Sequence, residues 1–353
     1  MSDAVLDVPA THDAIDGVPA PSANPVLFGH AGIRSFLAQA YQSGHMHHAL
    51  LLEGPQGVGK ATLAFHMTGH MLRYPAEREA PLELAEPDYG IAPYRQIASG
   101  THLAVLHISR PVDAKTGKFK TAITVDEVRR VTHFLNRTSH DGSWRIVIVD
   151  PADDMNRNAA NALLKTLEEP PHRTLFILIS HSSGRLLPTI RSRCQSIRFE
   201  PLDKKDLLAA LLAINLDAQQ MADVDSLVAH AEGSVRKAAL LLAFGGLEIS
   251  GTVDAILGKS TFDVPKAHAL ATALSGRDAE IQYDLFLEDL LARIAGKARL
   301  GAEQGDVVLA NRWSGLWSDM QNEARDAAAF NLDRKQTVLI FLGRMHRALS
   351  GAR

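Results

Sequence analysis

A glycine-rich segment with a lysine, Gly54 to Thr62, has the residue types and spacing of a phosphate-binding loop. It reads Gly-Pro-Gln-Gly-Val-Gly-Lys-Ala-Thr and follows an apolar run that is expected to form a strand. The glycines Gly54, Gly57 and Gly59 would let backbone N–H groups turn toward phosphate oxygens, and Lys60 would reach the terminal phosphates. The sequence therefore predicts a nucleotide site.

The position that follows this lysine departs from the usual pattern, because it carries Ala61. A Ser or Thr normally stands there, and its hydroxyl binds Mg²⁺. Thr62 comes one residue later, turned by about 100° around the expected helix. The sequence therefore offers Thr62 as a nucleotide-binding candidate and assigns no metal ligand. A loop of this shape that binds nothing is the alternative interpretation.

A second candidate, Asp150, ends the apolar run 145–149. A carboxylate in this place usually holds Mg²⁺ through water, and a Glu beside it polarises the attacking water. Here the next residue is Pro151, which has no proton acceptor. Nucleotide is expected to bind, but hydrolysis by this chain is expected to be weak or absent. The nearby Asp153 and Asp154 are offset from the strand end, which favours a solvated acidic turn.

Short apolar runs alternate with helical patterns in the first 200 residues, which is typical of βαβ units around a parallel sheet. These runs predict strands at 49–52, 104–108, 145–149, 175–179 and 196–199. Helices are predicted at 125–136 and 158–168, the second ending at Pro170-Pro171 because a residue before proline is pushed out of the α region. Residues 73–101 contain four prolines and no periodicity, so they are expected to form an irregular insertion loop.

Beyond Pro201 the apolar residues take helical spacing only, so the last third is expected to be all-helical. The predicted division has four parts. They are a disordered tail at 1–24, an α/β nucleotide-binding domain at 25–200, a small helical domain at 201–245 and a helical C-terminal domain at 246–353.

Composition excludes several classes of protein. With 46% hydrophobic and 22% charged residues the chain can build cores, and its net charge of −3 creates no global attraction to nucleic acid, so any DNA contact must be local or shared with partners. One cysteine, Cys194, allows neither an internal disulfide nor a multi-cysteine zinc module, which favours a cytoplasmic location. The longest apolar run has eight residues, against the ~18 that cross a bilayer, so no membrane span is expected.

Two further motifs give the chain a family resemblance. Ser192-Arg193-Cys194 follows Leu-Pro-Thr-Ile, and Asn161 to Pro171 reads Asn-Ala-Leu-Leu-Lys-Thr-Leu-Glu-Glu-Pro-Pro. Together they closely resemble the clamp-loader ATPases of bacterial DNA polymerase III. The resemblance covers about residues 27–245, and these long motifs are far more specific than a phosphate-binding loop alone.

The resemblance implies an AAA+ fold with a helical lid and a helical collar. It also implies a ring of five subunits, with tau or gamma and delta subunits as partners, that opens the sliding clamp and loads it on primed DNA. By the same resemblance Arg193 would act in trans on the ATP site of a neighbouring subunit, and Arg236, in Gly-Ser-Val-Arg-Lys-Ala, would face this chain's own nucleotide. Ser180 and His181 fall in the region of the sensor-1 motif.

The chain departs from this family in one respect. Many relatives carry a four-cysteine zinc module between the phosphate-loop helix and the next strand, whereas residues 73–101 contain no cysteine, so no zinc is expected. Three alternatives stay open. The chain could be a catalytically competent AAA+ ATPase, a stand-alone P-loop NTPase acting on a small molecule, or a structural adaptor that has lost nucleotide.

Overall fold

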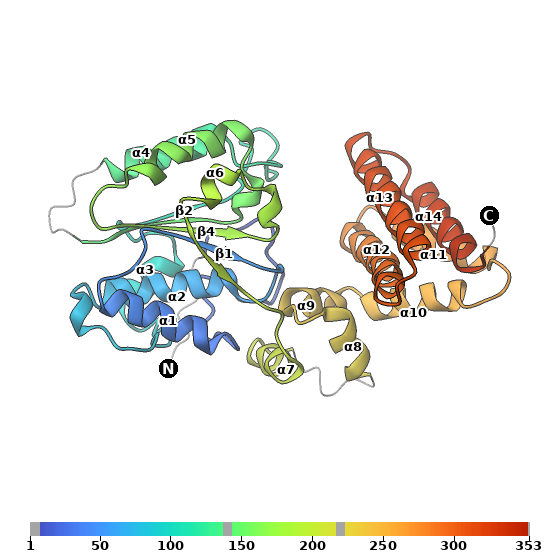
Figure 1. Ribbon diagram of the computed structural model, residues 1–353, viewed down its shortest axis with the longest axis horizontal. Helices are drawn as coiled ribbons and strands as arrows, with labels where there is room; N and C mark the ends of the chain where they lie inside the picture. Colours follow the sequence, from blue (N-terminus) through green and yellow to red (C-terminus); the bar gives the residue numbers. More distant parts are fainter. Residues whose placement is uncertain (1–7, 137–142, 217–222, 352–353) are drawn as a thin grey trace. The chain divides into compact units, whose positions relative to one another are not determined.

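The computed structural model describes residues 8–136, 143–216 and 223–351. The chain divides into two compact units, which are drawn in Figure 1. Unit 1 contains residues 1–222 and 232–236, and unit 2 contains residues 223–231 and 237–353. The division into nucleotide-binding, lid and collar domains stays a prediction.

Unit 1 is built on a five-stranded parallel sheet with the strand order β2-β3-β4-β1-β5. The strands are β1 (Ala49–Glu53), β2 (Val105–Ile108), β3 (Arg145–Val149), β4 (Thr174–Ser180) and β5 (Gln195–Arg198). All five predicted strands are confirmed, with ends that differ from the prediction by at most one residue. In the sheet centre Leu51 pairs with Leu178 of β4 and with Ser196 of β5.

Helices cover both faces of this sheet, as Figure 1 shows. Alternate residues of a strand point to opposite faces, so Leu50 and Leu52 pack on one side, while Ala49 and Leu51 pack on the other. The first face carries α1 (Ala31–Gln42), α2 (Lys60–Arg73) and α3 (Ala92–Ala98). The second face carries α4 (Val125–Leu135), α5 (Arg157–Glu168) and α6 (Pro188–Arg191).

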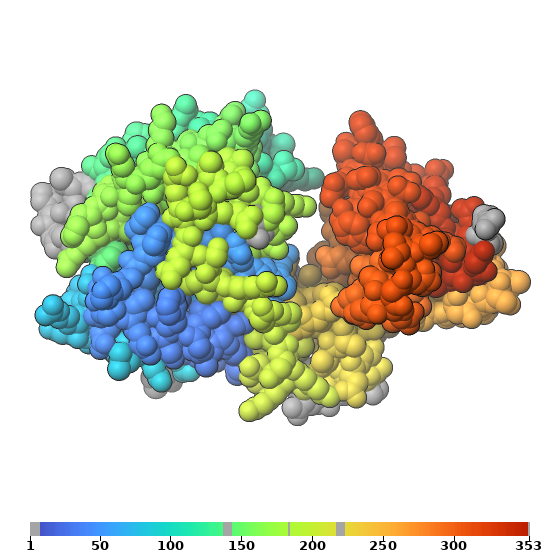
Figure 2. Space-filling view, viewed as in Figure 1, coloured from blue at the N-terminus to red at the C-terminus, as the bar shows by residue number. Residues whose placement is uncertain are grey.

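The edge at β5 brings together chain segments that are distant in sequence. In Figure 2 the yellow-green chain around β5 lies against the blue N-terminal part of unit 1. The ring of His30, just before α1, lies 4.6 Å from the ring of Phe199, just after β5, measured between centroids. The chain leaves the sheet at this edge, after β5, and continues into the helices that follow.

The prediction of an irregular loop at 73–101 is wrong in part. A short 3-10 helix, η1 (Glu77–Glu79), and the seven-residue α3 lie within it. Helix α3 is too short for a periodic pattern to stand out, yet it buries Tyr94, Ile97 and Ala98. Tyr94 packs directly on Gly69 of α2, where a Cβ would lie 2.2 Å from its ring.

The prediction of a disordered tail at 1–24 is also wrong for the residues that the structure describes. Residues 8–24 have no regular secondary structure, but they run across unit 1 and make specific contacts. The Ser22 hydroxyl donates to the Ala98 carbonyl at 3.3 Å, and the ring of His66 hydrogen-bonds the Asn24 carbonyl at 2.8 Å. Residues 1–7 lie outside the described part of the chain.

After residue 201 the described chain is all-helical, which confirms the prediction. The helices are α7 (Lys204–Ala213), α8 (Val224–Ala231), α9 (Val235–Ala243), α10 (Gly246–Leu257), α11 (Val264–Leu274), α12 (Glu280–Glu303), α13 (Val307–Ala329) and α14 (Arg334–Leu349). Two further 3-10 turns, η2 (Ala152–Asp154) and η3 (Ser183–Arg185), belong to unit 1. A core that includes Phe286, Trp313, Met320 and Phe341 joins the helices of unit 2.

Across the described ranges, no single helix has the length and apolar character needed to cross a membrane. Helices α9 and α10 have that length and apolar character only when their residues are taken together, and the two helices are bent by 80° at the break between them.

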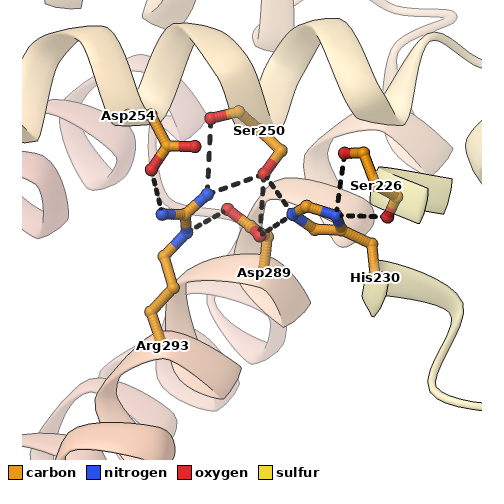
Figure 3. Close-up of polar contacts among 6 residues, drawn as sticks. All are labelled: Ser226, His230, Ser250, Asp254, Asp289 and Arg293. Atoms are coloured by element: carbon orange, nitrogen blue, oxygen red, sulfur yellow. Dashed lines mark hydrogen bonds and ion pairs between the residues drawn. The ribbon is translucent and has the colours of Figure 1, made fainter. Parts of the chain in front are cut away.

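A polar network inside unit 2 joins α8 to α10 and α12 (Figure 3). The Ser250 hydroxyl lies 2.8 Å from Nε2 of His230 and donates to Oδ1 of Asp289 at 3.1 Å. Arg293 donates to the same hydroxyl at 2.6 Å and to Oδ2 of Asp289 at 2.7 Å, and it also pairs with Asp254. Buried polar groups need such partners, so the network fixes α8 to these two helices.

Candidate nucleotide site and exposed arginine

The phosphate-binding loop lies between β1 and α2, as predicted, and its conformation depends on glycine. Gly57 has φ +79°, and a Cβ there would lie 2.4 Å from both the Cβ of Arg236 and the Oγ of Ser234. Gly54 has φ +141°, and a Cβ there would lie 2.4 Å from the Phe199 carbonyl oxygen. Both positions therefore need glycine for backbone conformation and for close approach of other segments.

The residues around Arg236 dock onto this loop. The Val235 N–H donates to the Gly57 carbonyl at 3.0 Å, and the Ser234 hydroxyl donates to the Gln56 carbonyl at 2.8 Å. These contacts bring the Arg236 side chain to the pocket beside the loop, although it is 176 residues away from Lys60 in the sequence. Arg236 and Lys60 therefore line the same cavity, and the assignment of Arg236 to a bound nucleotide stays a prediction.

Lys60 is 3% exposed, and its Nζ donates to the carbonyls of Gly54, at 2.6 Å, and Pro55. Burial lowers the pKa of Lys60 to about 8, against the attraction of the Asp150 and Asp153 carboxylates. Ala61 follows with no hydroxyl, and Thr62 is buried and lines the pocket.

Strand order places the other candidates beside Lys60. The carboxyl ends of parallel strands meet at one edge of a sheet, and β4 lies between β1 and β3. His181, directly after β4, therefore stands between the loop after β1 and Asp150 after β3. Burial raises the pKa of Asp150 to about 7, with a further contribution from Asp13 and an opposing one from Lys60. Burial also lowers the pKa of His181 to about 4.

Asp153 is not part of a solvated acidic turn, so that prediction is wrong. Its carboxylate accepts from the Ser180 hydroxyl at 2.7 Å and from the backbone N–H groups of His181 and Ser182 at 2.5 and 3.1 Å. It therefore braces the end of β4 against the turn that follows β3. The Ser180 and His181 pair, which was assigned only to a sensor neighbourhood, is held in place by this carboxylate.

Asp154 is also engaged, since Arg110 donates to it from Nε at 2.5 Å and from Nη2 at 2.8 Å. Such a two-pronged arginine–carboxylate pair has a defined geometry as well as favourable energy. The His12 ring lies 3.8 Å from the same carboxylate. The turn after β3 is therefore a structural junction that joins the end of β2 to the N-terminal segment.

We expect Asp153→Ala to destabilise unit 1 by about 2 kcal/mol, because the Ser180 hydroxyl and the His181 N–H lose a charged acceptor in a poorly solvated place. Urea unfolding followed by circular dichroism measures this loss. Asp16→Ala serves as the control, because Asp16 is an exposed carboxylate on the N-terminal segment. A loss below about 0.5 kcal/mol, which is usual for exposed positions, would show that Asp153 braces nothing.

The glycine loop, Asp150, His181 and Arg236 line a cavity of about 190 Å³ with two chemically different ends. The polar end has Lys60, Asp150, His181 and Arg236, and the apolar end is formed by residues of the N-terminal segment, of α7 and of the chain before α1. Anionic and apolar parts in one ligand match this arrangement, as in a nucleotide. Among the residues of the described ranges, no group of three or more His, Cys, Asp or Glu is placed to hold a metal ion.

Arg193 lies elsewhere, in the turn between α6 and β5, and does not line this cavity. Its Nη2 is 2.6 Å from Oε1 of Glu168 at the end of α5, and its Nη1 donates to the Thr189 carbonyl at 2.8 Å. About a third of the side chain is exposed. Glu168 and Thr189 therefore hold the guanidinium in place at a position outside the chain's own pocket.

Comparisons with known proteins relate this arrangement to others. The family described as "DNA polymerase III, delta subunit" matches residues 29–203. The chain is 42% identical over 148 residues to the DNA polymerase III subunit delta′ of Pseudomonas aeruginosa, which covers 42% of this chain and 41% of that one. It is 35% identical over 159 residues to the DNA polymerase III subunit delta′ of Escherichia coli. That alignment covers 45% of this chain and 44% of the Escherichia coli subunit.

A relative with longer coverage decides the family. The replication factor C small subunit of Aeropyrum pernix is 30% identical over 274 residues, which cover 73% of this chain and 74% of the relative. The chain belongs to the clamp-loader family. Its alignments span somewhat under half the length of the two delta′ chains. The clamp-loader fold, an α/β P-loop domain with a parallel sheet followed by helices, is the one that the structure has.

Within this clamp-loader chain, the sequence predicted the glycine loop and the charged residues beside it but missed one charged contributor. Gly54, Gly57, Gly59, Lys60, Thr62, Asp150 and Arg236 all lie at the loop or line the cavity beside it. Asp13 lines the cavity but was not assigned to the site. It lies far from the loop in sequence and gives no local signal, and only the folded chain brings it close to Asp150.

Proposed function

We propose that this chain is the delta-prime subunit of a DNA polymerase III clamp loader. In this function it assembles with tau or gamma and delta subunits into a ring of five, and the ring loads the sliding clamp on primed DNA. A cytoplasmic location accompanies this function. The family membership supports the proposal, as do the delta′ relatives from two bacteria.

The observation that carries the proposal is the contrast between two sites in unit 1. The chain's own pocket has Ala61 where a metal-binding hydroxyl normally stands and Pro151 where a water-activating carboxylate normally stands. Arg193 is presented outside that pocket by Glu168 and Thr189. The resemblance to the family gives this arginine a neighbouring subunit's ATP site as its target, where its planar fork would stabilise the charge of phosphoryl transfer.

The pocket of this chain is proposed to bind an adenine nucleotide without turning it over. Its glycine loop, Lys60 and Arg236 support binding, and its two substitutions support the loss of turnover. A structural nucleotide of this kind would stabilise the docking of Ser234 and Val235 on the loop. The expected absence of zinc stays a prediction.

The purified chain should show little or no ATP hydrolysis of its own, because neither a metal-binding hydroxyl nor a general base stands at the required positions. Phosphate release from ATP, measured with and without a Lys60→Ala variant, checks this. Background release that does not depend on Lys60 is the expected outcome. Turnover in the range of ordinary P-loop ATPases that Lys60→Ala abolishes would contradict the proposal and favour a competent AAA+ ATPase.

Two other functions fit the observations less well. A stand-alone P-loop NTPase that acts on a small molecule needs the metal-binding hydroxyl and the water-activating carboxylate that are missing here. It also assigns no role to Arg193. A purely structural adaptor would not need Lys60 buried in an intact glycine loop beside Arg236.

Assembly tests the proposed function directly. The full chain should co-purify with tau or gamma and delta subunits of the same bacterium when they are expressed together. The reconstituted complex should load a labelled clamp onto primed DNA, and the complex without this chain should not. Failure to join the complex would refute the function.

A further inference from the structure

The N-terminal segment 11–21 forms one wall of the nucleotide pocket and reaches both of its ends. Ile15, Val18 and Pro19 line the apolar end, while Asp13 lines the cavity together with Lys60, Asp150 and His181 at the polar end. A carboxylate thus comes from outside the P-loop fold to the place where phosphates would be bound.

Contacts along its length hold this segment in place. The Arg236 guanidinium donates to the backbone carbonyl of Asp13, and the His12 ring lies against the Phe119 ring with 6.3 Å between centroids. Farther along, the Tyr89 hydroxyl donates to the Ser22 carbonyl at 3.1 Å. Asp13 is therefore positioned by its neighbours and not merely carried by a free end.

The charge of Asp13 acts on the groups of the polar end. After burial, it is the largest cause of the raised pKa of Asp150, and it also acts on His181 and Arg110. These interactions require the carboxylate to be close to the end of β3. Asp13 and Asp150 together place two acidic groups at this point of the pocket.

In a P-loop site the diphosphate lies in the glycine loop, and the terminal phosphate of a triphosphate extends toward the carboxylate at the end of another strand of the sheet, here Asp150 after β3. That is the end where Asp13 lies. A third phosphate would meet an additional negative charge there, and Arg236, which could offset it, already donates to the Asp13 backbone.

We propose that this pocket takes a nucleoside diphosphate in preference to a triphosphate, and that Asp13 is the residue that sets this preference. The proposal rests on the nucleotide site of the proposed function and specifies its ligand. It also gives the N-terminal segment a role, since without that segment the glycine loop and Lys60 would be open to either nucleotide.

The test compares ADP and ATP binding to the full chain by isothermal titration calorimetry in buffer with Mg²⁺. The wild-type chain should bind ADP at least about tenfold more tightly than ATP, which corresponds to about 1.4 kcal/mol. Asp13→Asn keeps the size of the side chain and removes its charge. This variant should bind ATP about as tightly as ADP, through a gain in ATP affinity and with ADP affinity nearly unchanged.

Asp16→Asn is the matched control, because Asp16 is an exposed carboxylate on the same segment and does not line the cavity. It should retain the wild-type preference for ADP. Thermal unfolding of all three proteins verifies that the substitutions leave the fold intact. A second readout is hydrogen exchange of residues 11–21, which ADP should slow in the wild-type chain.

Four outcomes would overturn the proposal. Equal affinities of the wild-type chain for ADP and ATP would show that the pocket has no preference. An unchanged preference for ADP in Asp13→Asn would show that Asp13 does not cause it. Tighter ATP binding that Asp13→Asn weakens would instead make Asp13 a ligand of the Mg²⁺ that accompanies ATP. No binding of either nucleotide by any variant would refute the site itself, whereas assembly into the loader complex would still decide the proposed function.

Discussion

Arg193→Ala should lower ATP hydrolysis at one site of the reconstituted loader by about three orders of magnitude, the usual effect of removing an arginine finger. The loss should fall on turnover and spare ATP binding, because the finger acts on charge that develops in the transition state. Total hydrolysis should fall only in part, since the other sites take their arginines from other subunits. Single-turnover ATP hydrolysis with the purified complex measures the effect.

Folding should be nearly unaffected by this substitution. Arg193 and Glu168 are partly exposed, at 35% and 48% of their side chains, and an exposed ion pair contributes about 0–1 kcal/mol. Arg193→Lys should rescue hydrolysis poorly, because an ammonium cannot reproduce the planar fork of donors. Arg191→Ala removes an exposed arginine two residues away and should leave hydrolysis unchanged.

A double variant identifies the site on which Arg193 acts. Arg193→Ala is combined with a substitution of the phosphate-loop lysine in the neighbouring subunit. If both act at the same site, the second change adds almost no further loss. Losses that multiply independently would show that Arg193 acts elsewhere or is an ordinary surface residue.

Asp150→Asn should stabilise the protein at neutral pH and have almost no effect at pH 4. The pKa of Asp150 is raised from its ordinary value of 3.8 to about 7 by burial and by Asp13, so the folded protein holds this proton more strongly than the unfolded chain does. The free energy of unfolding therefore falls as the pH rises from about 4 to about 7. Asparagine cannot ionise, so the variant escapes this loss.

The expected size follows from the difference between the two pKa values. About three pKa units at about 1.4 kcal/mol each give a gain of up to roughly 4 kcal/mol near pH 7.5. Urea unfolding of wild type and variant between pH 4 and pH 7.5 measures it. Asp16→Asn, at an exposed position on the N-terminal segment, is the control. A gain that is equal at both ends of the range would mean that Asp150 keeps an ordinary pKa.

Local patterns were sufficient to predict the sheet and the loop that binds phosphate. Each strand is a short apolar run, and both faces of a parallel sheet are covered, so the runs are continuous and easy to locate. The glycine and lysine spacing is likewise a local pattern, although Gly54 and Gly57 also leave room for segments that are distant in sequence. These features were predictable because each leaves a pattern within a few neighbouring residues.

The parts that were missed depend on distant partners. The N-terminal segment has the composition of a disordered tail, and it is ordered by Arg236, Tyr89, Ala98 and His66, which come from four different elements or loops. Asp153 was assigned to solvent because its place on a turn says nothing about the N–H groups at the end of β4. Both errors arise where tertiary contacts outweigh local composition.

The polar network of unit 2 determines where the chain can be cut. His230 of α8 depends on Ser250 and Asp289, which follow it by 20 and 59 residues. A shortened chain that stopped at Phe244 would contain α8 but neither of these partners, and the buried face of α8 around Leu227 would lose its support. Proteolytic trimming from the C-terminus should therefore loosen α8 along with α10 and α12, because cooperative folding units follow contacts and not sequence order.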